Sequence, residues 1–302
     1  MSATISPTIS VLTPVLNGGR FLRESLGSVL AQEHSGVEHI IADGGSTDGT
    51  LRLLESFPAS RVLAGPDRGI YDGINRALQS SSGRIIGILN ADDCYAPGVL
   101  NEVAAAFEDG GLMAVFGEAV TFRDDAEQDR PIANAHSEPL FMATLGTPII
   151  NAWFFRRSVF EQLGFFSAAY RIAGDREFLL RFALSGLRCH RLARVVCRYR
   201  AHAGSLTFAG SDDVWQTVLN EHHRMTTEYL RRRGLNPQAR ELLKLARSRD
   251  ALQGALYSAE HGQMRQLWTH ALAGVRHDPV WLMRFAARAA QLMMKPRTGL
   301  PT

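Results

Sequence analysis

Two adjacent carboxylates, Asp92 and Asp93, are the residues of this chain with the clearest potential for chemistry. They belong to the segment NADD at residues 90–93, directly after an apolar run that predicts a buried strand. Like charges this close repel, so a cation or a hydrogen-bond network is expected to compensate them. Mg²⁺ and Mn²⁺ prefer oxygen ligands and often join one or two carboxylates to substrate phosphates. A solvated turn with a helix cap also accounts for these residues, and spacing alone leaves both interpretations open.

A second candidate site is DGGSTDGT at residues 43–50, which closes another predicted strand. Its two adjacent glycines allow close approach of the backbone to a ligand, or a positive φ. Asp43, at the end of the strand, can accept a hydrogen bond from a base or a ribose. A tight strand-to-helix turn, with Asp48 as the helix cap, explains the same motif.

Two residues further along the chain are candidates for proton transfer or ligand binding. Asp175 lies in AGDREF, directly before an amphipathic helix, so it is either the N-cap of that helix or a general base at the rim of a cleft. His202 lies in YRAH at residues 199–202. A lone histidine is either a metal or ligand contact, or a structural or exposed side chain, and its type alone does not distinguish these.

The elements that must position these residues are strands and helices that alternate through the first two thirds of the chain. Apolar runs predict strands at residues 9–15, 37–42, 61–64, 84–89 and 112–116. Apolar residues at helical spacing lie between them, and Pro97 is expected to open one of these helices. Such alternation is typical of an α/β protein with a mostly parallel sheet and helices on both faces. Ligands of such sheets bind beyond the carboxyl ends of the strands, where Asp43 and Asp92 both fall.

From residue 211 onward the sequence shows only helical patterns. We therefore expect a catalytic or binding domain at residues 1–210 and a helical extension at residues 211–302. The extension has 14 Lys and Arg against 8 Asp and Glu, a net charge of +6. Its last residues interleave basic side chains such as Arg284 and Arg288 with apolar ones such as Trp281 and Phe285. Amphipathic basic helices lie on anionic membranes or pack on protein, and both interpretations stay open here.

Composition and missing motifs argue against several classes of protein. The chain has 302 residues with a net charge of +3, too small to indicate a nucleic-acid partner. Its three cysteines form no CxxC pair, which excludes a zinc ribbon. The dinucleotide-binding, P-loop, nucleophile-elbow and HExxH motifs are absent. No apolar run reaches the ~18 residues of a spanning helix and no signal-peptide pattern opens the chain, so we expect a cytoplasmic protein.

Seven segments taken together resemble glycosyltransferase family 2, whose members have the GT-A fold. They occur in the family's order between residues 9 and 205, and they read ISVLTPVLNGG, IIADGGSTDGT, GPDRGIYDGINRAL, GRIIGILNADD, FFRRSVFEQLGFF, IAGDREFLLR and YRAHAGS. The chain is most similar to the bacterial branch that makes surface polysaccharide or lipid-linked glycans. The resemblance implies inverting transfer from a nucleotide-sugar, by default a UDP-sugar, to a hydroxyl of a glycan or lipid-linked acceptor. It also implies a divalent cation, Mn²⁺ or Mg²⁺, and a place in the cytoplasm or on the inner face of the cell membrane.

The resemblance implies roles for residues on the donor side. Thr13, Pro14 and Val15 match the first-strand segment that packs near the nucleobase. Asp43 matches the acid that contacts uracil, and Arg68 matches a basic position beside the base and ribose. These residues come from three separate segments of the chain, so the implied donor site is expected to form where the segments meet.

It also implies roles at the reacting end. Asp92 would face the ribose, whereas Asp93 would hold the metal, and His202 would complete the metal or pyrophosphate site. Asp175 matches the catalytic base. The family usually has an acid before this base, but here Gly174 stands there.

Two more departures concern the acceptor and the product. Relatives often carry His-Gln where this chain has Ile150 and Asn151, so its acceptor contacts are expected to differ. The QxxRW motif of processive synthases is absent, which argues against a polymerase of that type.

Three other functions stay open on the sequence, and one of them is an assembly protein that acts through its helical extension, with catalysis secondary. A non-catalytic nucleotide-sugar binding or scaffold protein would be expected to have lost Asp93 or Asp175, and both are intact. A sugar nucleotidyltransferase needs a glycine-rich loop with Arg or Lys after the first strand, which NGGRFL matches poorly. The sequence is also compatible with a homo-oligomer.

Overall fold

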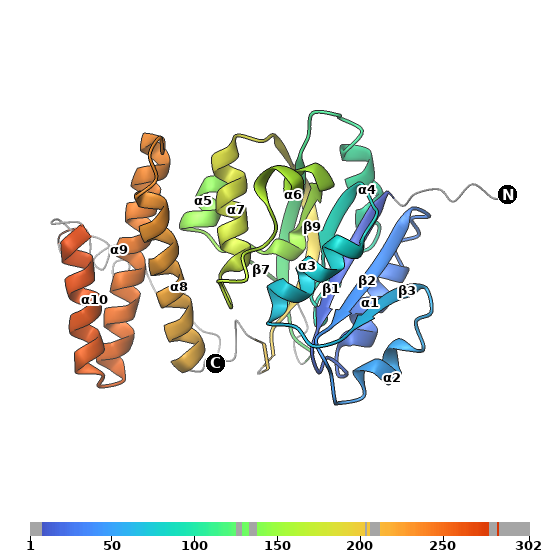
Figure 1. The fold of residues 1–302 in the computed structure, drawn as a ribbon, viewed down its shortest axis with the longest axis horizontal. Helices are drawn as coiled ribbons and strands as arrows, with labels where there is room; N and C mark the ends of the chain where they lie inside the picture. The colour runs from blue at the N-terminus through green and yellow to red at the C-terminus, as the bar shows by residue number, and fades with distance from the viewer. Residues whose placement is uncertain are drawn as a thin grey trace. The chain divides into compact units, whose positions relative to one another are not determined.

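The computed structural model describes residues 8–124, 129–132, 138–202, 204–205, 212–277 and 283. The chain forms two compact units, Met1–Gly210 and Ser211–Thr302 (Figure 1). The first contains all of the candidate site residues, and the second is helical in its described part. Each unit is considered by itself below.

A single mixed sheet is the centre of the first unit. Its strands, within the described residues, are β1 (Ile9–Val15), β2 (Val37–Asp43), β3 (Ser60–Ala64), β4 (Ile85–Ile88), β5 (Cys94–Tyr95), β6 (Ala114–Phe122), β7 (Arg130–Pro131), β8 (Trp153–Arg156) and β9 (Cys189–Arg200). The spatial order is β3-β2-β1-β4-β8-β6-β9-β5, with β7 paired to β6. The predicted strands all form, and β6 runs beyond its predicted end.

The N-terminal half of the sheet is parallel, as predicted. Strand β1 pairs in parallel with β2 on one side and with β4 on the other, and β3 continues the parallel array beyond β2. Strand β8 is antiparallel to both β4 and β6. The chain adds β2 and β3 on one side of β1 and then crosses to β4 on the other. In such sheets, ligands usually bind beyond the carboxyl ends of the strands at this change of direction, here the ends of β1 and β4.

Seven α-helices lie in the described part of the first unit. They are α1 (Leu22–Leu30), α2 (Thr50–Leu54), α3 (Ile70–Ser80), α4 (Val99–Ala106), α5 (Pro139–Thr144), α6 (Arg157–Leu163) and α7 (Gly174–Ser185), and a 3-10 helix, η1, spans Ile150–Ala152. Two local expectations need correction. Pro97 does not open α4, which begins after Gly98 in a left-handed conformation with φ 71°. Asp48 is not the N-cap of α2 either, because Gly49 is, although the Asp48 carboxylate still accepts from Thr50 N at 3.0 Å.

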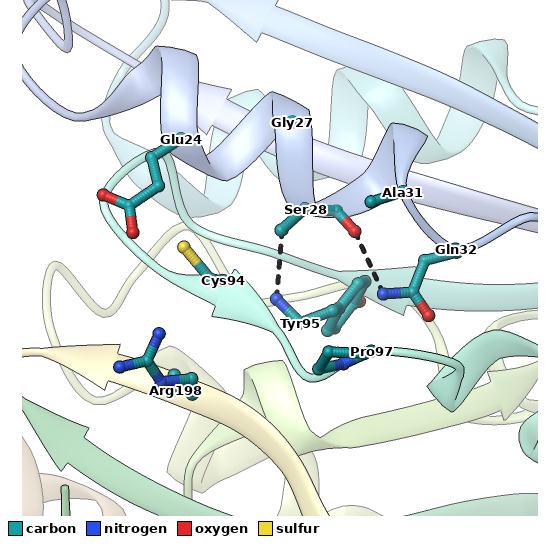
Figure 2. A pocket seen from close by; sticks show the side chains of 9 residues that line it. All are labelled: Glu24, Gly27, Ser28, Ala31, Gln32, Cys94, Tyr95, Pro97 and Arg198. Atoms are coloured by element: carbon teal, nitrogen blue, oxygen red, sulfur yellow. Dashed lines mark hydrogen bonds between the residues drawn. The ribbon is translucent and has the colours of Figure 1, made fainter.

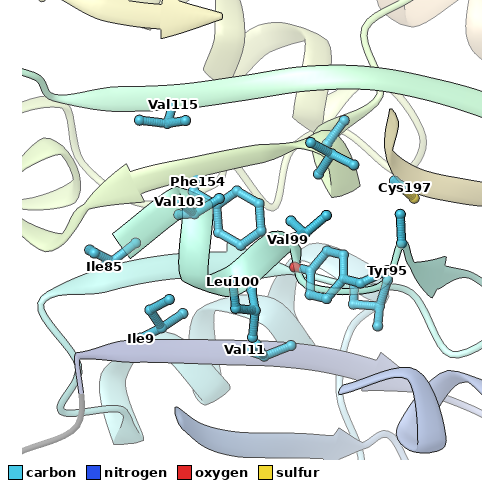
Figure 3. Close-up of a cluster of buried hydrophobic side chains, with 14 of the residues drawn as sticks. Ile9, Val11, Ile85, Tyr95, Val99, Leu100, Val103, Val115, Phe154 and Cys197 are labelled. Carbon is cyan, nitrogen blue, oxygen red and sulfur yellow. The ribbon is translucent and has the colours of Figure 1, made fainter. Parts of the chain in front are cut away.

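Helices cover both faces of the sheet because strand side chains alternate in direction. On one face, Ile9 and Val11 of β1 and Phe154 of β8 pack with Val99 and Val103 of α4 (Figure 3). The neighbouring residue of β8 points to the opposite face.

That opposite face holds a cluster of aromatic rings. Phe155 of β8 lies edge-on to Phe178 and Phe182 of α7, with ring centroids 5.2 and 5.6 Å apart, respectively. Edge-to-face packing of this kind stabilises aromatic pairs beyond the apolar area they bury. The cluster therefore anchors the start of α7, the helix that carries Asp175, to the sheet.

The second unit contains α8 (Asp212–Leu230), α9 (Pro237–Glu260) and α10 (Met264–His277), and α9 packs against both of the others (Figure 1). Helix α9 begins as its sequence favours, with Pro237 in the first turn and the Asn236 side chain accepting from Ala239 N at 2.7 Å. The predicted stripe at Trp281 and Phe285 lies outside the described residues. Among the helices that can be described, none combines the length and hydropathy of a membrane-spanning segment.

Candidate active site

Two of the predicted acidic motifs meet at one edge of the sheet. Asp43 is the last residue of β2 and lies opposite Val15, the last residue of β1. The NADD turn follows β4, where Leu89 N donates to Leu12 O of β1 at 3.0 Å. Ser25 of α1 holds the turn by donating to Asn90 O at 3.1 Å. The carboxyl ends of three parallel strands thus bring Asp43 and the NADD turn to the same edge of the sheet.

Asp43 is fully buried but only half satisfied. One carboxylate oxygen, Oδ1, accepts from the backbone N–H groups of Gly45 and Ser46, both at 2.9 Å. The other, Oδ2, is buried and has no hydrogen-bond partner among the described residues. An unsatisfied buried acceptor costs about 1–3 kcal/mol, so such atoms call for an explanation. A ligand that donates a hydrogen bond to Oδ2 supplies one.

The residues at the end of β1 are buried, which limits how they can contact a ligand. The Thr13 hydroxyl lies 2.9 Å from His39 Nε2. Burial lowers the pKa of His39 to about 4, so its ring is neutral at physiological pH and suits this interior contact. Pro14 and Val15 are also buried. Contacts from this segment to a ligand would therefore come from its backbone.

Arg68 lies in the loop before α3 with its side chain in solvent. The guanidinium is 3.0 Å from Asp72 Oδ1, and the Arg68 backbone N–H also donates to this carboxylate. These hydrogen bonds lower the pKa of Asp72. The same loop lies against the Asp43 turn, because a Cβ on Gly44 would be 2.7 Å from Asp67 Oδ2. Arg68 is thus an exposed cation beside the loop that carries Asp43.

Asp92 and Asp93 have opposite environments although they are adjacent. Asp93 is 1% exposed, and its carboxylate accepts from the Arg200 backbone N–H at 2.8 Å and from the side-chain amide of Asn151. Burial raises the pKa of Asp93 well above its ordinary value, and the charge of Asp92 adds to this effect. The Asp92 side chain is 30% exposed, and its Oδ2 lies 3.0 Å from Nε2 of His202.

The family resemblance implied a metal-binding role for Asp93, which stays a prediction. Both oxygens of Asp93 accept hydrogen bonds inside the protein in this structure. Asp92 and His202 present a carboxylate oxygen and an imidazole nitrogen side by side, and the carboxylate is a ligand type that suits Mn²⁺ and Mg²⁺. The described residues contain no group of three or more His, Cys, Asp or Glu side chains placed to hold a metal. The pair therefore fits a cation whose remaining ligands are substrate phosphates and water.

Arg200 stabilises the turn that contains Asp92, a role that the sequence did not predict. Its side chain is 2% exposed, and its Nε donates to the backbone oxygen of Asp92 at 3.0 Å. Its guanidinium also pairs with the carboxylates of Glu24 and Asp124. Arg200 lies two residues before His202, in a segment already noted for that histidine. Its partners are remote in sequence, so no local signal marked it.

Asp175 is the second residue of α7. Ala173 is the N-cap of this helix, so Asp175 does not cap it. Its Oδ1 accepts from Arg176 N at 2.7 Å and from the Tyr71 hydroxyl at 3.2 Å. No donor among the described residues reaches Oδ2. Burial raises the pKa of this carboxyl, and the Arg176 charge and the hydrogen bonds from Tyr71 and from the backbone N–H groups of Arg176 and Asp175 offset only part of the rise. A carboxylate with one oxygen held, one oxygen available and a raised pKa suits a general base.

Arg176, another residue that sequence reasoning missed, holds the loop after α5. Its guanidinium donates to the backbone oxygens of Ala143, Thr144 and Gly146 at 3.0–3.2 Å. Because the end of a helix leaves carbonyl groups unsatisfied, a cation there is stabilising. The loop and Asp175 are therefore tied to the same turn of α7.

A cavity of about 390 Å³ between α1, β5 and β9 is a separate feature (Figure 2). Its polar lining is largely engaged within the protein, since Ser28 accepts from Tyr95 N at 3.1 Å and Gln32 donates to Ser28 O at 3.0 Å. Asp43, Asp92, His202 and Asp175 do not line it. The cavity is therefore not the candidate active site.

Comparison with known protein families identifies the class of this fold and site. The sequence profile described as glycosyl transferase family 2 matches residues 10–168, more than half of the chain. The chain therefore belongs to glycosyltransferase family 2. An uncharacterized glycosyltransferase of Mycobacterium tuberculosis is 30% identical over 187 residues, which cover 60% of this chain and 71% of the relative. A PGL/p-HBAD biosynthesis glycosyltransferase of Mycobacterium bovis is 28% identical over 211 residues, covering 66% and 79%.

Solved structures show the same fold at low sequence identity. TarS residues 1–349 of S. aureus, solved with UDP-GlcNAc, has a TM-score of 0.61 at 14% identity, with 87% of this chain and 90% of that one covered. The match spans only 43% of a longer TarS chain. The mannosyltransferase PcManGT of Pyrobaculum calidifontis, solved with GDP-Man and Mn²⁺, has a TM-score of 0.62 at 21% identity, with 97% and 82% covered. These likenesses confirm the predicted GT-A-like architecture.

Proposed function

We propose that this family 2 glycosyltransferase moves a sugar, with inversion, from a UDP-sugar to a hydroxyl of a glycan or lipid-linked acceptor. The observation that carries the proposal is the buried, unpartnered Oδ2 of Asp43, at the same strand edge as the Asp92–His202 pair. Because Oδ1 already holds two backbone N–H groups, one oxygen is left for the base. Uracil offers a single ring N–H donor, so it matches this one free acceptor.

The proposed reaction exchanges one C–O bond for another. Asp175 accepts the proton of the acceptor hydroxyl through Oδ2 while that oxygen attacks the anomeric carbon. The bond from that carbon to the diphosphate breaks on the opposite side and its electron pair leaves with the nucleotide, which inverts the configuration. Asp92 and His202 would hold a divalent cation, which stabilises charge on a leaving diphosphate when bound. The backbone of β1 and the Asp43 turn orient the nucleoside.

Named ligands of the fold neighbours support the donor class and the metal. TarS was solved with UDP-GlcNAc, and PcManGT with GDP-Man and Mn²⁺. A relative named as a PGL/p-HBAD biosynthesis glycosyltransferase supports transfer of a sugar in a biosynthetic reaction. A scaffold protein would also bind a nucleotide-sugar, but it would not need a buried carboxyl with a raised pKa at Asp175.

A thermal-shift panel tests the donor site. UDP-, GDP- and dTDP-sugars are each added with Mn²⁺, Mg²⁺ or EDTA. At 100 times its dissociation constant a ligand adds about 2.7 kcal/mol to the free energy of unfolding, which is readily seen as a rise in Tm. We expect that rise with UDP-sugars and metal, and its reduction in EDTA.

The Asp43→Asn variant tests whether Asp43 itself contributes to the donor affinity seen in the panel. Its amide nitrogen cannot accept the base N–H, so we expect a fall in UDP-sugar affinity of about 5- to 150-fold, the equivalent of about 1–3 kcal/mol. Asp109→Asn is the matched control, because Asp109 also holds a turn by accepting from a backbone N–H, that of Gly111 at 2.8 Å. Equal UDP-sugar affinity in both variants would remove Asp43 from the donor site.

We also propose that α10 contacts an anionic membrane surface at the inner face of the cell membrane. Met264, Trp268 and Leu272 follow each other at four-residue spacing and are 57%, 60% and 55% exposed, respectively. The other side of the helix packs on α9, since a Cβ on Gly254 would lie 2.7 Å from His270. The net charge of +6 over residues 211–302 complements anionic lipid.

Vesicle flotation tests this surface. We expect the protein to float with vesicles containing phosphatidylglycerol and to stay in solution with neutral ones. A triple Ser variant of Met264, Trp268 and Leu272 should lose flotation because it removes the apolar contact. Leu30→Ser with Leu51→Ser is the control, since these exposed leucines lie in the first unit. Undiminished flotation of the triple variant would reject a membrane role for α10.

A further inference from the structure

Tyr71 lies in the first turn of α3 and reaches the candidate base from the other side of the site. The residue is 6% exposed, and its hydroxyl donates to the backbone oxygen of Ile172 at 2.5 Å. The same hydroxyl is 3.2 Å from Asp175 Oδ1. A tyrosine hydroxyl has one O–H donor, so Ile172 O and Asp175 Oδ1 share it, and the contact with Ile172 O is the shorter. One side chain thus contacts both the segment that leads into α7 and the carboxylate on that helix.

The ring of Tyr71 explains the glycine that precedes the base. A Cβ on Gly174 would lie 2.6 Å from Cε2 of Tyr71, closer than real Cβ contacts allow. The ring is also stacked on Phe166, with centroids 5.8 Å apart and an interplanar angle of 16°. The place beside the base that an acidic side chain usually fills in this family is therefore taken by the Tyr71 ring.

A second contact, one helical turn further along α3, makes this position rigid. Asn75 Nδ2 donates to Phe166 O at 2.8 Å, and Phe166 N donates to Asn75 Oδ1 at 3.1 Å. Residues four apart lie on the same side of a helix, so Tyr71 and Asn75 present one surface to this segment. The backbone before α7 is thus fixed at Phe166 and again at Ile172.

We propose that Tyr71 is a positioning residue for Asp175, which holds Oδ1 so that Oδ2 is directed at the acceptor hydroxyl. This inference rests on the proposed function, in which Asp175 is the base. Without the hydroxyl, Oδ1 keeps only its contact with the Arg176 backbone N–H, which lies next to it in the chain. The carboxylate can then rotate about its side-chain bonds. A misplacement of about 1 Å at a reacting group can cost ~10²-fold in rate.

The ionisable and hydrogen-bonding groups around Asp175 determine how its pKa should change when the Tyr71 hydroxyl is removed. On α7 the neighbouring charges are Arg176 and the buried Glu177, which pairs with Arg181 at 2.9 Å, and α5 contributes no ionisable side chain. Helix α6 contains Arg157, which donates a hydrogen bond to Gly83 O in the loop before β4, and the exposed Glu161. Helix α3 contributes the Tyr71 hydroxyl, which lowers the pKa of the carboxyl. Loss of that hydroxyl should therefore move the pKa of Asp175 further upward.

The Tyr71→Phe variant tests the inference because it keeps the ring against Gly174 and removes only the hydroxyl. We expect kcat to fall about 10- to 100-fold while the dissociation constant of the donor stays unchanged. The acidic limb of the kcat/KM profile should move to higher pH. An NMR titration of the Asp175 side-chain carboxyl should show the same upward movement of its pKa without any turnover.

Tyr95→Phe is the matched control, because Tyr95 is also buried and its hydroxyl donates to a backbone oxygen, that of Ile88 at 3.1 Å. We expect it to leave kcat and the Asp175 titration at wild-type values. Wild-type kcat and an unmoved Asp175 pKa in Tyr71→Phe would overturn the inference. If the pKa of Asp175 moves in Tyr71→Phe but the wild-type protein transfers no sugar, the positioning contact stands and the proposed function fails.

Discussion

Asp175→Asn should reduce kcat by about 10²–10⁴-fold, the usual contribution of a general base, while donor affinity stays unchanged. The amide cannot accept the proton of the acceptor hydroxyl, but it keeps the size and shape of the carboxyl. The donor contacts assigned to Asp43 and Asp92 come from other strands, so they should survive. Single-turnover transfer and isothermal titration with the donor separate the two effects. Near-normal turnover would remove Asp175 from the role of base.

The pH dependence of this variant provides an internal control. Burial raises the pKa of Asp175 in the folded protein above its value in the unfolded chain. Between those two values the folded state binds more protons, so stability falls as pH rises through this window. An asparagine side chain does not titrate, so it causes no such loss of stability as the pH rises. Asp175→Asn should therefore be at least as stable as wild type at neutral pH. A lower Tm at pH 7 would mean that the activity loss reflects damage to the fold.

The second large effect is expected from Asp92→Ala, which should abolish the metal-dependent part of donor binding. Asp92 Oδ2 and His202 Nε2 are 3.0 Å apart, and removal of the carboxylate leaves the imidazole as the one protein ligand of that pair. A cation shared with substrate phosphates then loses its charged protein partner. Titration of the donor with Mn²⁺ and with EDTA measures the difference. We expect the two curves to coincide in Asp92→Ala and to be well separated in wild type.

Asp93→Asn is the matched control, and it distinguishes the two adjacent acids. An Asn oxygen can still accept from the Arg200 backbone N–H. Its new amide can donate to Asn151 once that side chain turns its Oδ1 inward, an oxygen that is buried without a partner. We therefore expect Asp93→Asn to fold and to keep metal-dependent donor binding. Loss of metal dependence in Asp93→Asn, together with its survival in Asp92→Ala, would return the metal role to Asp93.

The sequence by itself determined the architecture and the places where chemistry occurs. Apolar runs located five strands and helical spacing located the helices between them, because a buried strand or an amphipathic helix must match its own period. Predicted and observed bounds agree for β1 and differ by one residue at one or both ends for β2, β3 and β4, whereas β6 runs beyond its predicted end. The remaining strands, β5, β7, β8 and β9, were not predicted. The ordered segments also pointed to the family and to Asp43, Asp92, His202 and Asp175. These were accessible because strand ends and motif segments are local properties of a chain.

Only the tertiary structure decided what the individual side chains face. Asp92 and Asp93 are adjacent residues of the same type. Asp92 is partly exposed beside His202, whereas Asp93 is buried between Arg200 and Asn151. Burial and hydrogen bonding of a carboxylate depend on residues that are distant in sequence and adjacent in space.

The residues that support the site could not be predicted either, because their partners are also distant in sequence. Tyr71 and Asp175 are separated by 104 positions, and Arg200 reaches Glu24 across 176. Gly174 looked like a missing acid in the sequence, whereas in the fold it is the space that the Tyr71 ring requires. A sequence motif names the groups that can react, but the packing of remote elements selects which oxygen is held and which is left for a substrate.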